Sequence, residues 1–249
     1  LSNAFSQGRL AHAFILTGVR GVGKTTTARI IAKGINCIGA DGKGGATIDP
    51  CGVCANCTGI MEDRHVDVME MDAASRTGVD DIREILDGVR YKPVAARNKV
   101  YIIDEVHMLS RNAFNALLKT LEEPPENVKF IFATTEIRKV PVTVLSRCQR
   151  FDLKRLGMED LARLFSTVCQ KENITIERDA LYALGRAADG SARDGLSLLD
   201  QSMALSVGEI TAEVVQGMLG SSDRANILDL FEETMSVSYT HLTLPTKNE

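Results

Sequence analysis

The stretch Gly18-Val19-Arg20-Gly21-Val22-Gly23-Lys24-Thr25 follows the pattern G-x-x-x-x-G-K-[ST]. An apolar run at 13–16 precedes it, and a helix-like segment at 25–32 follows it. In such a loop the glycines let backbone N–H groups turn inward around phosphate oxygens, and the helix N-terminus adds partial positive charge. The stretch therefore predicts a strand, a phosphate-binding loop and a helix, in that order.

Two residues at the end of this loop have side chains suited to a nucleoside triphosphate. Lys24 is expected to reach the β- and γ-phosphates, and the hydroxyl of Thr25 is expected to hold Mg²⁺. The pattern favours a chain that binds a nucleoside triphosphate, or one that descends from such a chain. The candidate nucleotide-binding residues are Gly18, Val19, Arg20, Gly21, Val22, Gly23, Lys24, Thr25 and Thr26.

The bulk composition is that of an ordinary globular protein. The 249 residues include 44% hydrophobic and 25% charged residues, with a net charge of −4 and no Trp. These values disfavour a base-stacking platform for single-stranded nucleic acid and require that any DNA contact come from a local patch. No apolar run approaches the roughly 18 residues of a membrane span, and no signal peptide is visible. We therefore expect a cytoplasmic protein without a membrane partner.

The cysteines are spaced for a metal site. Cys51, Cys54 and Cys57 form C-x-x-C-x-x-C, and Cys37 lies upstream across a glycine-rich loop. Four thiolates satisfy a tetrahedral Zn²⁺ ion, so structural zinc is the favoured interpretation. An iron–sulfur cluster and free thiols are the alternatives. The iron–sulfur motif continues with another cysteine, and Met61 stands in that position here.

Alternating strands and helices predict an α/β fold with a parallel sheet in the first 154 residues. The third and fourth strand candidates are near-continuous apolar runs, as expected for strands covered on both faces. Ser110 is a plausible N-cap of the second intervening helix. The expected strands are 13–16, 66–71, 99–104, 129–134 and 151–153, and the helices between them include 78–89 and 111–122.

Strand patterns stop beyond residue 154, which predicts a second, small, all-helical domain. A further helix is expected at 224–235, and the Thr-rich tail 236–249 fits nothing before it and is interpreted as non-native. The helices expected in the second domain are 158–171, 177–188, 191–205 and 211–219.

The predicted third strand ends in two carboxylates, Asp104 and Glu105. In open α/β folds ligands bind at the carboxyl edge of the sheet, where these residues are expected to lie. Asp104 is the candidate to share Mg²⁺ with Thr25, and Glu105 is the candidate general base that polarises a water for attack on the γ-phosphate. The alternative is a solvated turn, which the upstream phosphate loop disfavours.

Three further residues are candidates for the same chemistry. Thr135, at the end of the fourth predicted strand, is chosen as a sensor facing the γ-phosphate and the attacking water. Arg147 and Arg193 are arginine candidates, because a guanidinium stabilises charge spread over γ-phosphate oxygens. From the residues alone, surface salt bridging is the favoured role for either arginine.

Taken together, these motifs resemble a known family. The phosphate loop and cysteine insert are followed in order by Asp104-Glu105-Val106-His107, Ser146-Arg147-Cys148 and Gly190-Ser191-x-Arg193-Asp194. This combination resembles the gamma/tau subunits of bacterial DNA polymerase III, which are AAA+ ATPases of the clamp loader. The resemblance covers residues 1 to about 235.

The resemblance implies an AAA+ ATPase domain at 1–154 with sheet order 5-1-4-3-2, a zinc module inserted at 37–57, a helical lid at 155–220, and the start of a collar at 221–235. It implies ATP, Mg²⁺ and Zn²⁺ as cofactors, with Cys37, Cys51, Cys54 and Cys57 as zinc ligands. It also implies that Arg147 acts on a neighbouring subunit's ATP and that Arg193 is the sensor arginine of the lid. His107 is assigned no catalytic duty beyond packing or a hydrogen bond.

The function implied is ATP-driven loading of the sliding clamp onto primed DNA. The implied partners are the other subunits of a hetero-oligomeric clamp-loader ring, the clamp, primer–template DNA and the polymerase core. Any polymerase or nucleotidyltransferase label belongs to the holoenzyme, because nothing here suggests a polymerase active site. The alternatives are a clamp-loader arm that does not hydrolyse ATP, and another AAA+ motor such as a branch-migration helicase. The start at Leu1 suggests a fragment, and the resemblance implies that the residues before it help to enclose the adenine and ribose.

Overall fold

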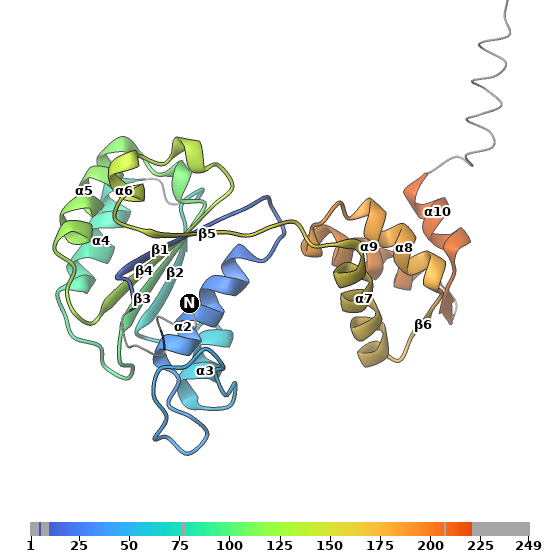
Figure 1. The fold of residues 1–249 in the computed structure, drawn as a ribbon, viewed down its shortest axis with the longest axis horizontal. Helices are drawn as coiled ribbons and strands as arrows, with labels where there is room; N and C mark the ends of the chain where they lie inside the picture. Colours follow the sequence, from blue (N-terminus) through green and yellow to red (C-terminus); the bar gives the residue numbers. More distant parts are fainter. Residues whose placement is uncertain (1–4, 6–9, 76–77, 207, 221–249) are drawn as a thin grey trace, which may run out of the picture. The chain divides into compact units, whose positions relative to one another are not determined.

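The computed structural model describes residues 5, 10–75, 78–206 and 208–220. The chain divides into two compact units. The first comprises the described part of Leu1–Leu156 with Ser191–Arg193, and the second comprises the described part of Gly157–Gly190 and Asp194–Glu249. Figure 1 shows a sheet covered by helices in the first unit and a group of helices in the second. The expected helix 224–235, the collar start and the tail 236–249 lie outside the described residues.

Five parallel strands form the sheet of the first unit, in the order β2-β3-β4-β1-β5. This is the predicted order 5-1-4-3-2 counted from the other edge, so the prediction is confirmed. Because all five strands are parallel, their carboxyl ends meet at one edge of the sheet. The strands are β1 (Ala13–Thr17), β2 (Val68–Asp72), β3 (Lys99–Asp104), β4 (Val128–Thr134) and β5 (Gln149–Asp152).

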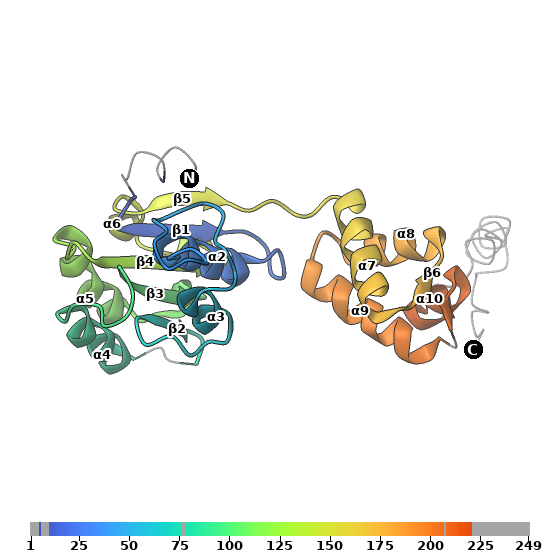
Figure 2. The ribbon, with the colours of Figure 1, turned by 90° about the horizontal axis from the view of Figure 1, so that it is seen from below.

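Helices bury both faces of this sheet (Figure 2). In β1, Ala13 and Ile15 join one apolar cluster, which includes Phe114 on the helix after β3. Phe14 and Leu16 join the other cluster, which includes Ile31 on the helix after β1. The helices of this unit are α2 (Lys24–Asn36), α3 (Ala55–Met61), α4 (Val79–Val89), α5 (Arg111–Glu122) and α6 (Val142–Leu145), with short 3₁₀ turns η1 (Val106–Met108) and η2 (Ile137–Lys139).

The boundaries of α5 follow from its sequence. The side chain of Ser110 accepts a hydrogen bond of 3.2 Å from the backbone N–H of Ala113, which satisfies one of the free donors of the first turn. Pro124 and Pro125 follow the last turn and cannot continue a helix. Buried apolar residues, among them Leu117, face the sheet between these two boundaries.

The edge strands differ most from the sequence expectation. We predicted 66–71 and 151–153, whereas β2 is Val68–Asp72 and β5 is Gln149–Asp152. Val66 is 72% exposed, and it precedes Asp67, whose carboxylate accepts hydrogen bonds from the backbone N–H groups of Val94 and Ala95. β5 consists mostly of exposed polar residues, so its position at the sheet edge leaves no apolar pattern to reveal it.

The second unit is helical except for one short pair of strands. We predicted only helices, but β6 (Thr175–Ile176) pairs in parallel with β7 (Glu209–Ile210). Two residues are too few to show a strand periodicity. The helices are α7 (Met158–Glu172), α8 (Arg178–Ala187), α9 (Ala192–Leu205) and α10 (Ala212–Leu219).

One glycine permits close packing in this unit. A Cβ on Gly195 of α9 would lie 2.5 Å from the Cζ of Phe165 on α7. The absence of that carbon lets the buried Phe165 ring rest directly on the α9 backbone, which brings the two helices together.

Candidate functional site

The phosphate-loop motif lies where its sequence predicts, between the end of β1 and the start of α2. Gly23 is the residue before the helix and has a left-handed backbone, with φ of 91°. Gly18 lies close to the chain beyond β5, since a Cβ there would meet the carbonyl oxygen of Leu153 at 2.7 Å. Both positions need glycine: Gly23 because side chains disfavour its backbone, and Gly18 because nothing larger fits.

Lys24 is the first residue of α2, and its ammonium group lies within the loop. The side chain is buried, and its Nζ donates to the carbonyl oxygens of Gly18 and Val19 at 3.1 Å each. Burial lowers the pKa of Lys24, and the nearby carboxylates of Glu105 and Asp104 oppose this shift. A lysine ammonium held in a loop that leads into a helix N-terminus is suited to binding an anion.

Thr25 and Asp104 lie together, as predicted. The Thr25 hydroxyl donates to the Asp104 carboxylate at 2.5 Å. The other carboxylate oxygen of Asp104 accepts from the backbone N–H of Glu105 at 2.8 Å. β4 lies between β1 and β3 in the sheet, so this contact reaches from α2 across the end of β4 to the end of β3.

Glu105 has a left-handed backbone, with φ of 44°, which is uncommon for a residue with a side chain. Its Oε2 accepts from the backbone N–H of Thr135 at 3.2 Å and from the Thr135 hydroxyl at 3.0 Å. The structure thus brings Thr135 to Glu105, and both lie at the same sheet edge as Asp104. The roles that we assign to these residues stay predictions.

Sequence analysis missed an ion pair beside this contact. Arg29, one turn along α2 from Thr25, pairs with Glu70 on β2 through two hydrogen bonds of 2.6 and 2.8 Å. The hydrogen bonds to Glu70 raise the pKa of Arg29 despite the opposing effect of burial. Thr25, Arg29 and Glu70 line one cleft together with Asp104. A charged residue inside an otherwise apolar strand was the available sequence clue.

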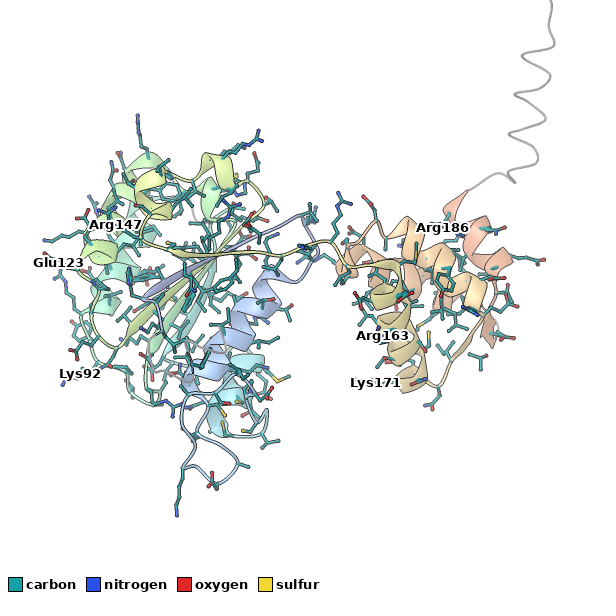
Figure 3. All side chains as sticks on the ribbon, viewed as in Figure 1. Lys92, Glu123, Arg147, Arg163, Lys171 and Arg186 are labelled. Atoms are coloured by element: carbon teal, nitrogen blue, oxygen red, sulfur yellow. The ribbon has the colours of Figure 1, made fainter. Side chains whose placement is uncertain are left out.

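Arg147 is not brought to the phosphate loop of its own chain. It lies two residues before β5, whose first residue, Gln149, pairs in register with Phe14 near the start of β1. The phosphate loop follows the opposite end of β1, so Arg147 lies toward the other edge of the sheet. Its Nη2 pairs with Glu122 at 2.6 Å, and Figure 3 shows it beside α5. Arg193 is the second residue of α9, and its sensor role stays a prediction.

The four predicted cysteines form one cluster. The Sγ atoms of Cys37, Cys51, Cys54 and Cys57 all lie within 4.8 Å of one another. Tetrahedral zinc with four thiolates requires sulfur–sulfur separations of about 3.8 Å, so small side-chain rotations would suffice to bind the ion. The donor set also suits zinc chemically, since thiolates are preferred ligands of this metal.

The thiols of the cluster differ in pKa. Burial would raise the pKa of Cys54, but backbone hydrogen bonds from Ile38 and Cys57 outweigh it and lower the pKa to about 6. Burial raises the pKa of Cys57 to about 12. Cys37 accepts from the backbone N–H groups of Gly39 and Cys51, at 3.4 Å each. Such donors stabilise thiolates.

A buried polar network fixes this module to the sheet, and the sequence did not reveal it. The Nδ2 of Asn56 donates to the carbonyl of Asn36 at 2.8 Å, and the Oδ1 of Asn56 lies 3.1 Å from the Nε2 of His65. Asn36, the last residue of α2, pairs through its side chain with both backbone groups of Asn98. His65 is therefore a structural hydrogen-bonding residue.

Arg97 also helps to hold the cysteine-containing segment 37–57 in place. Its guanidinium donates to the carbonyl of Ile35 at 3.0 and 3.2 Å, to that of Gly44 at 2.9 Å, and to that of Cys37. One side chain therefore binds carbonyls at the C-terminal end of α2 and in the loop that leads to the other cysteines.

Known proteins are similar in sequence to this chain. The family described as DNA polymerase III, delta subunit, matches residues 1–157, and that described as DNA polymerase III clamp loader subunit, ATPase lid domain, matches residues 161–208. The tau subunit of DNA polymerase III from Escherichia coli (strain K12) is 53% identical over 232 residues, which is 93% of this chain and 35% of that protein. The chain belongs to the gamma/tau family of DNA polymerase III clamp-loader subunits.

Other members of the gamma/tau family are similar over much of the chain. The gamma subunit from Buchnera aphidicola subsp. Baizongia pistaciae is 43% identical over 244 residues, covering 98% of this chain and 65% of that protein. The chain spans about a third of the length of the E. coli and Salmonella tau subunits. The Holliday junction branch migration motor RuvB of Thermotoga maritima shares the fold, with a TM-score of 0.63, 18% identity, and coverage of 96% of this chain and 74% of that one. This clamp-loader chain therefore has the AAA+ ATPase fold.

The helices also bear on membrane association. Within the described residues, none of the helices is both long enough and apolar enough to cross a bilayer.

The close approach at Gly18 generates a stability prediction. Replacing Gly18 with Ala forces Cβ against the Leu153 carbonyl, so we expect the free energy of unfolding of the first unit to fall by roughly 1–3 kcal/mol. Gly45→Ala is the matched control, because a Cβ at Gly45 meets no atom within 4 Å. Hydrogen exchange of the slowest β1 amides measures the difference. Equal protection in the two variants would contradict the close approach.

Proposed function

We propose that this chain binds ATP with Mg²⁺ and hydrolyses it, and that the full-length protein uses hydrolysis to load a sliding clamp onto primed DNA. The observation that carries the proposal is the convergence of Lys24, Thr25, Asp104, Glu105 and Thr135 at one sheet edge. Together they supply a cation to bind the phosphates, two oxygen atoms to bind a metal ion, a general base and a further hydroxyl group. An arm subunit that does not hydrolyse ATP would have no need of this full set.

Binding begins at the phosphate loop. The N–H groups of the loop and the N-terminus of α2 cradle the phosphates, and the Lys24 ammonium exchanges its contacts with Gly18 and Val19 for phosphate oxygens. Thr25 and Asp104 already lie within 2.5 Å of each other, so one hydroxyl and one carboxylate oxygen can serve the same ion. Mg²⁺ held there neutralises charge on the β- and γ-phosphates.

Hydrolysis requires an activated water. The Glu105 carboxylate removes a proton as the water oxygen forms its bond to the γ-phosphorus and the bond to the ADP oxygen breaks. Thr135 contacts Glu105 through two hydrogen bonds, so a change in phosphate contact at Thr135 is passed directly to the base. This coupling suits the sensor role.

The two arginines complete the proposed mechanism. Arg147 lies toward the sheet edge opposite to its own phosphate loop, which favours action on the nucleotide of a neighbouring subunit in the ring. Its ion pair with Glu122 would break when it does so. Arg193, at the start of α9, is assigned as a sensor of the γ-phosphate. Both guanidinium groups would stabilise charge on transferring phosphoryl oxygens.

The partners follow from family membership. We assign the full-length protein to a hetero-oligomeric clamp-loader ring that acts on the clamp, primer–template DNA and the polymerase core, in the cytoplasm. The cysteine cluster is assigned to structural Zn²⁺. It lies at the C-terminal end of α2, the helix that begins at the phosphate loop, so its proposed role is to hold that helix rather than to take part in hydrolysis.

A pair of variants tests the ATPase assignment. Glu105→Gln should retain ATP binding and lose at least about 100-fold of the turnover, because the base is removed while the phosphate site stays intact. Lys24→Ala should lose ATP binding as well. Nucleotide affinity and the ATPase rate of the full-length protein, with clamp and primed DNA, measure both effects. Glu123→Gln, an exposed acid at the end of α5, is the control, and normal turnover in Glu105→Gln would refute the assignment.

Mixing two inactive variants tests the action of Arg147 on a neighbour. Full-length Arg147→Ala binds ATP but lacks the guanidinium, whereas Lys24→Ala supplies the guanidinium but binds no ATP. Rings that contain both variants should recover part of the stimulated ATPase rate that each variant lacks alone. Arg150→Ala, an exposed arginine in the same segment, should keep the full rate. Failure of the mixture to recover activity would count against action between subunits.

Metal analysis tests the zinc assignment. Freshly prepared protein should contain about one zinc per chain, and Cys57→Ser should lose it because three thiolates and a hydroxyl bind zinc less tightly. Cys148→Ser, outside the cluster, should retain the metal. Chelation should speed hydrogen exchange in α3 while leaving β3 protected. Iron in place of zinc, or no metal at all, would overturn the assignment.

A further inference from the structure

A buried histidine, His107, contacts the proposed general base Glu105. His107 is in η1, two residues after Glu105, and its side chain is 6% exposed. The proposed mechanism gives this side chain no part. A buried imidazole needs hydrogen-bonding partners for both ring nitrogens, so the identity of its partners decides what it does.

The partners of His107 come from the ends of two neighbouring strands. Its Nδ1 lies 3.0 Å from the hydroxyl oxygen of Thr134 and 3.3 Å from the Oε2 of Glu105. Its Nε2 lies 3.6 Å from the Oε1 of Glu136. The Thr134 oxygen also accepts from the backbone N–H of Glu136 at 3.0 Å. His107, which follows β3, is therefore linked to the end of β4 through Thr134, and it also contacts the Glu105 carboxylate.

The Nδ1 of His107 lies within ion-pair distance of Glu105, and a hydrogen bond between them requires one tautomer of the imidazole. An ionised carboxylate can only accept hydrogen bonds, so the Nδ1 of His107 must carry the proton to bind it. The hydroxyl of Thr135 contacts the same Oε2 atom from its own side at 3.0 Å. The contacts from Thr135 and His107 all fall on Oε2, so these two residues leave Oε1 on the side where a water can approach.

We propose that His107 is a positioning residue for Glu105: it donates from Nδ1 to Oε2, fixes the carboxylate plane together with Thr135, and presents Oε1 to the attacking water. This inference rests on the proposed function of Glu105 as general base. His107 touches neither nucleotide nor water in this scheme. Its effect is confined to turnover, because fixing the orientation of a base lowers the barrier to proton transfer without adding a contact to bound ATP.

Three substitutions separate this role from simple packing. His107→Leu fills similar space without a donor, His107→Asn places an amide nitrogen near the Nδ1 position, and His107→Gln places one near the Nε2 position. The full-length protein, with clamp and primed DNA, should lose about 10-fold or more of kcat in the Leu and Gln variants. The Asn variant should keep most of the parent kcat. KM and the affinity for ATP should stay at the parent values in all three.

Several results would overturn the proposal. Equal losses in all three variants would indicate a packing role, and a parent-like kcat in His107→Leu would show that no donor is needed. If His107→Leu does not fold, the contrast between Asn and Gln decides alone, and equal rates in that pair reject the proposal. Glu105→Gln is measured in parallel. Normal turnover in Glu105→Gln rejects the general base itself, whereas its loss alongside a parent-like His107→Leu rejects only the positioning role.

Discussion

The contact between the Thr25 hydroxyl and the Asp104 carboxylate depends on more of the fold than any other interaction in the candidate site. It requires α2 to pack on one face of the sheet, β4 to separate β1 from β3, and both strands to run in the same direction. The buried clusters on the two faces enforce all three conditions. A parallel sheet covered on both sides is thus the condition for bringing the two proposed metal-binding oxygens together from positions 79 residues apart.

The predictable parts of this arrangement are those whose positions are set by residues next to them in sequence. Lys24 and Thr25 are placed by a loop and a helix start that adjoin them in sequence, and Asp104 and Glu105 are placed by the end of an apolar strand. Parallel strands end at one edge, so the sequence was sufficient to bring these two groups together. Spacing alone also gathered the four cysteines, because three of them lie within seven residues.

The unpredicted parts depend on contacts between distant residues or on weak patterns. Asn36 and Asn98 look like ordinary polar surface residues in sequence, and Glu70 stands out in its strand without indicating that Arg29 is its partner. His107 gave no clue to its role, since its partner Thr134 is distant in the chain. The strands β2 and β5 lie at sheet edges, where one side lacks a neighbour, and their apolar patterns are correspondingly weak. Tertiary pairing, rather than propensity, decides such positions.

The helix α2 connects two sites of opposite charge preference. Its N-terminus faces the phosphate loop, while its C-terminal residue Asn36 adjoins Cys37 of a cluster with thiolate character, an unfavourable charge at the negative end of a helix. The Arg97 guanidinium, bound to the carbonyls of Ile35 and Cys37, offsets that charge. A 13-residue helix is a rod of about 20 Å. With its C-terminal end anchored in this way, α2 gives the phosphate loop at its other end a fixed support.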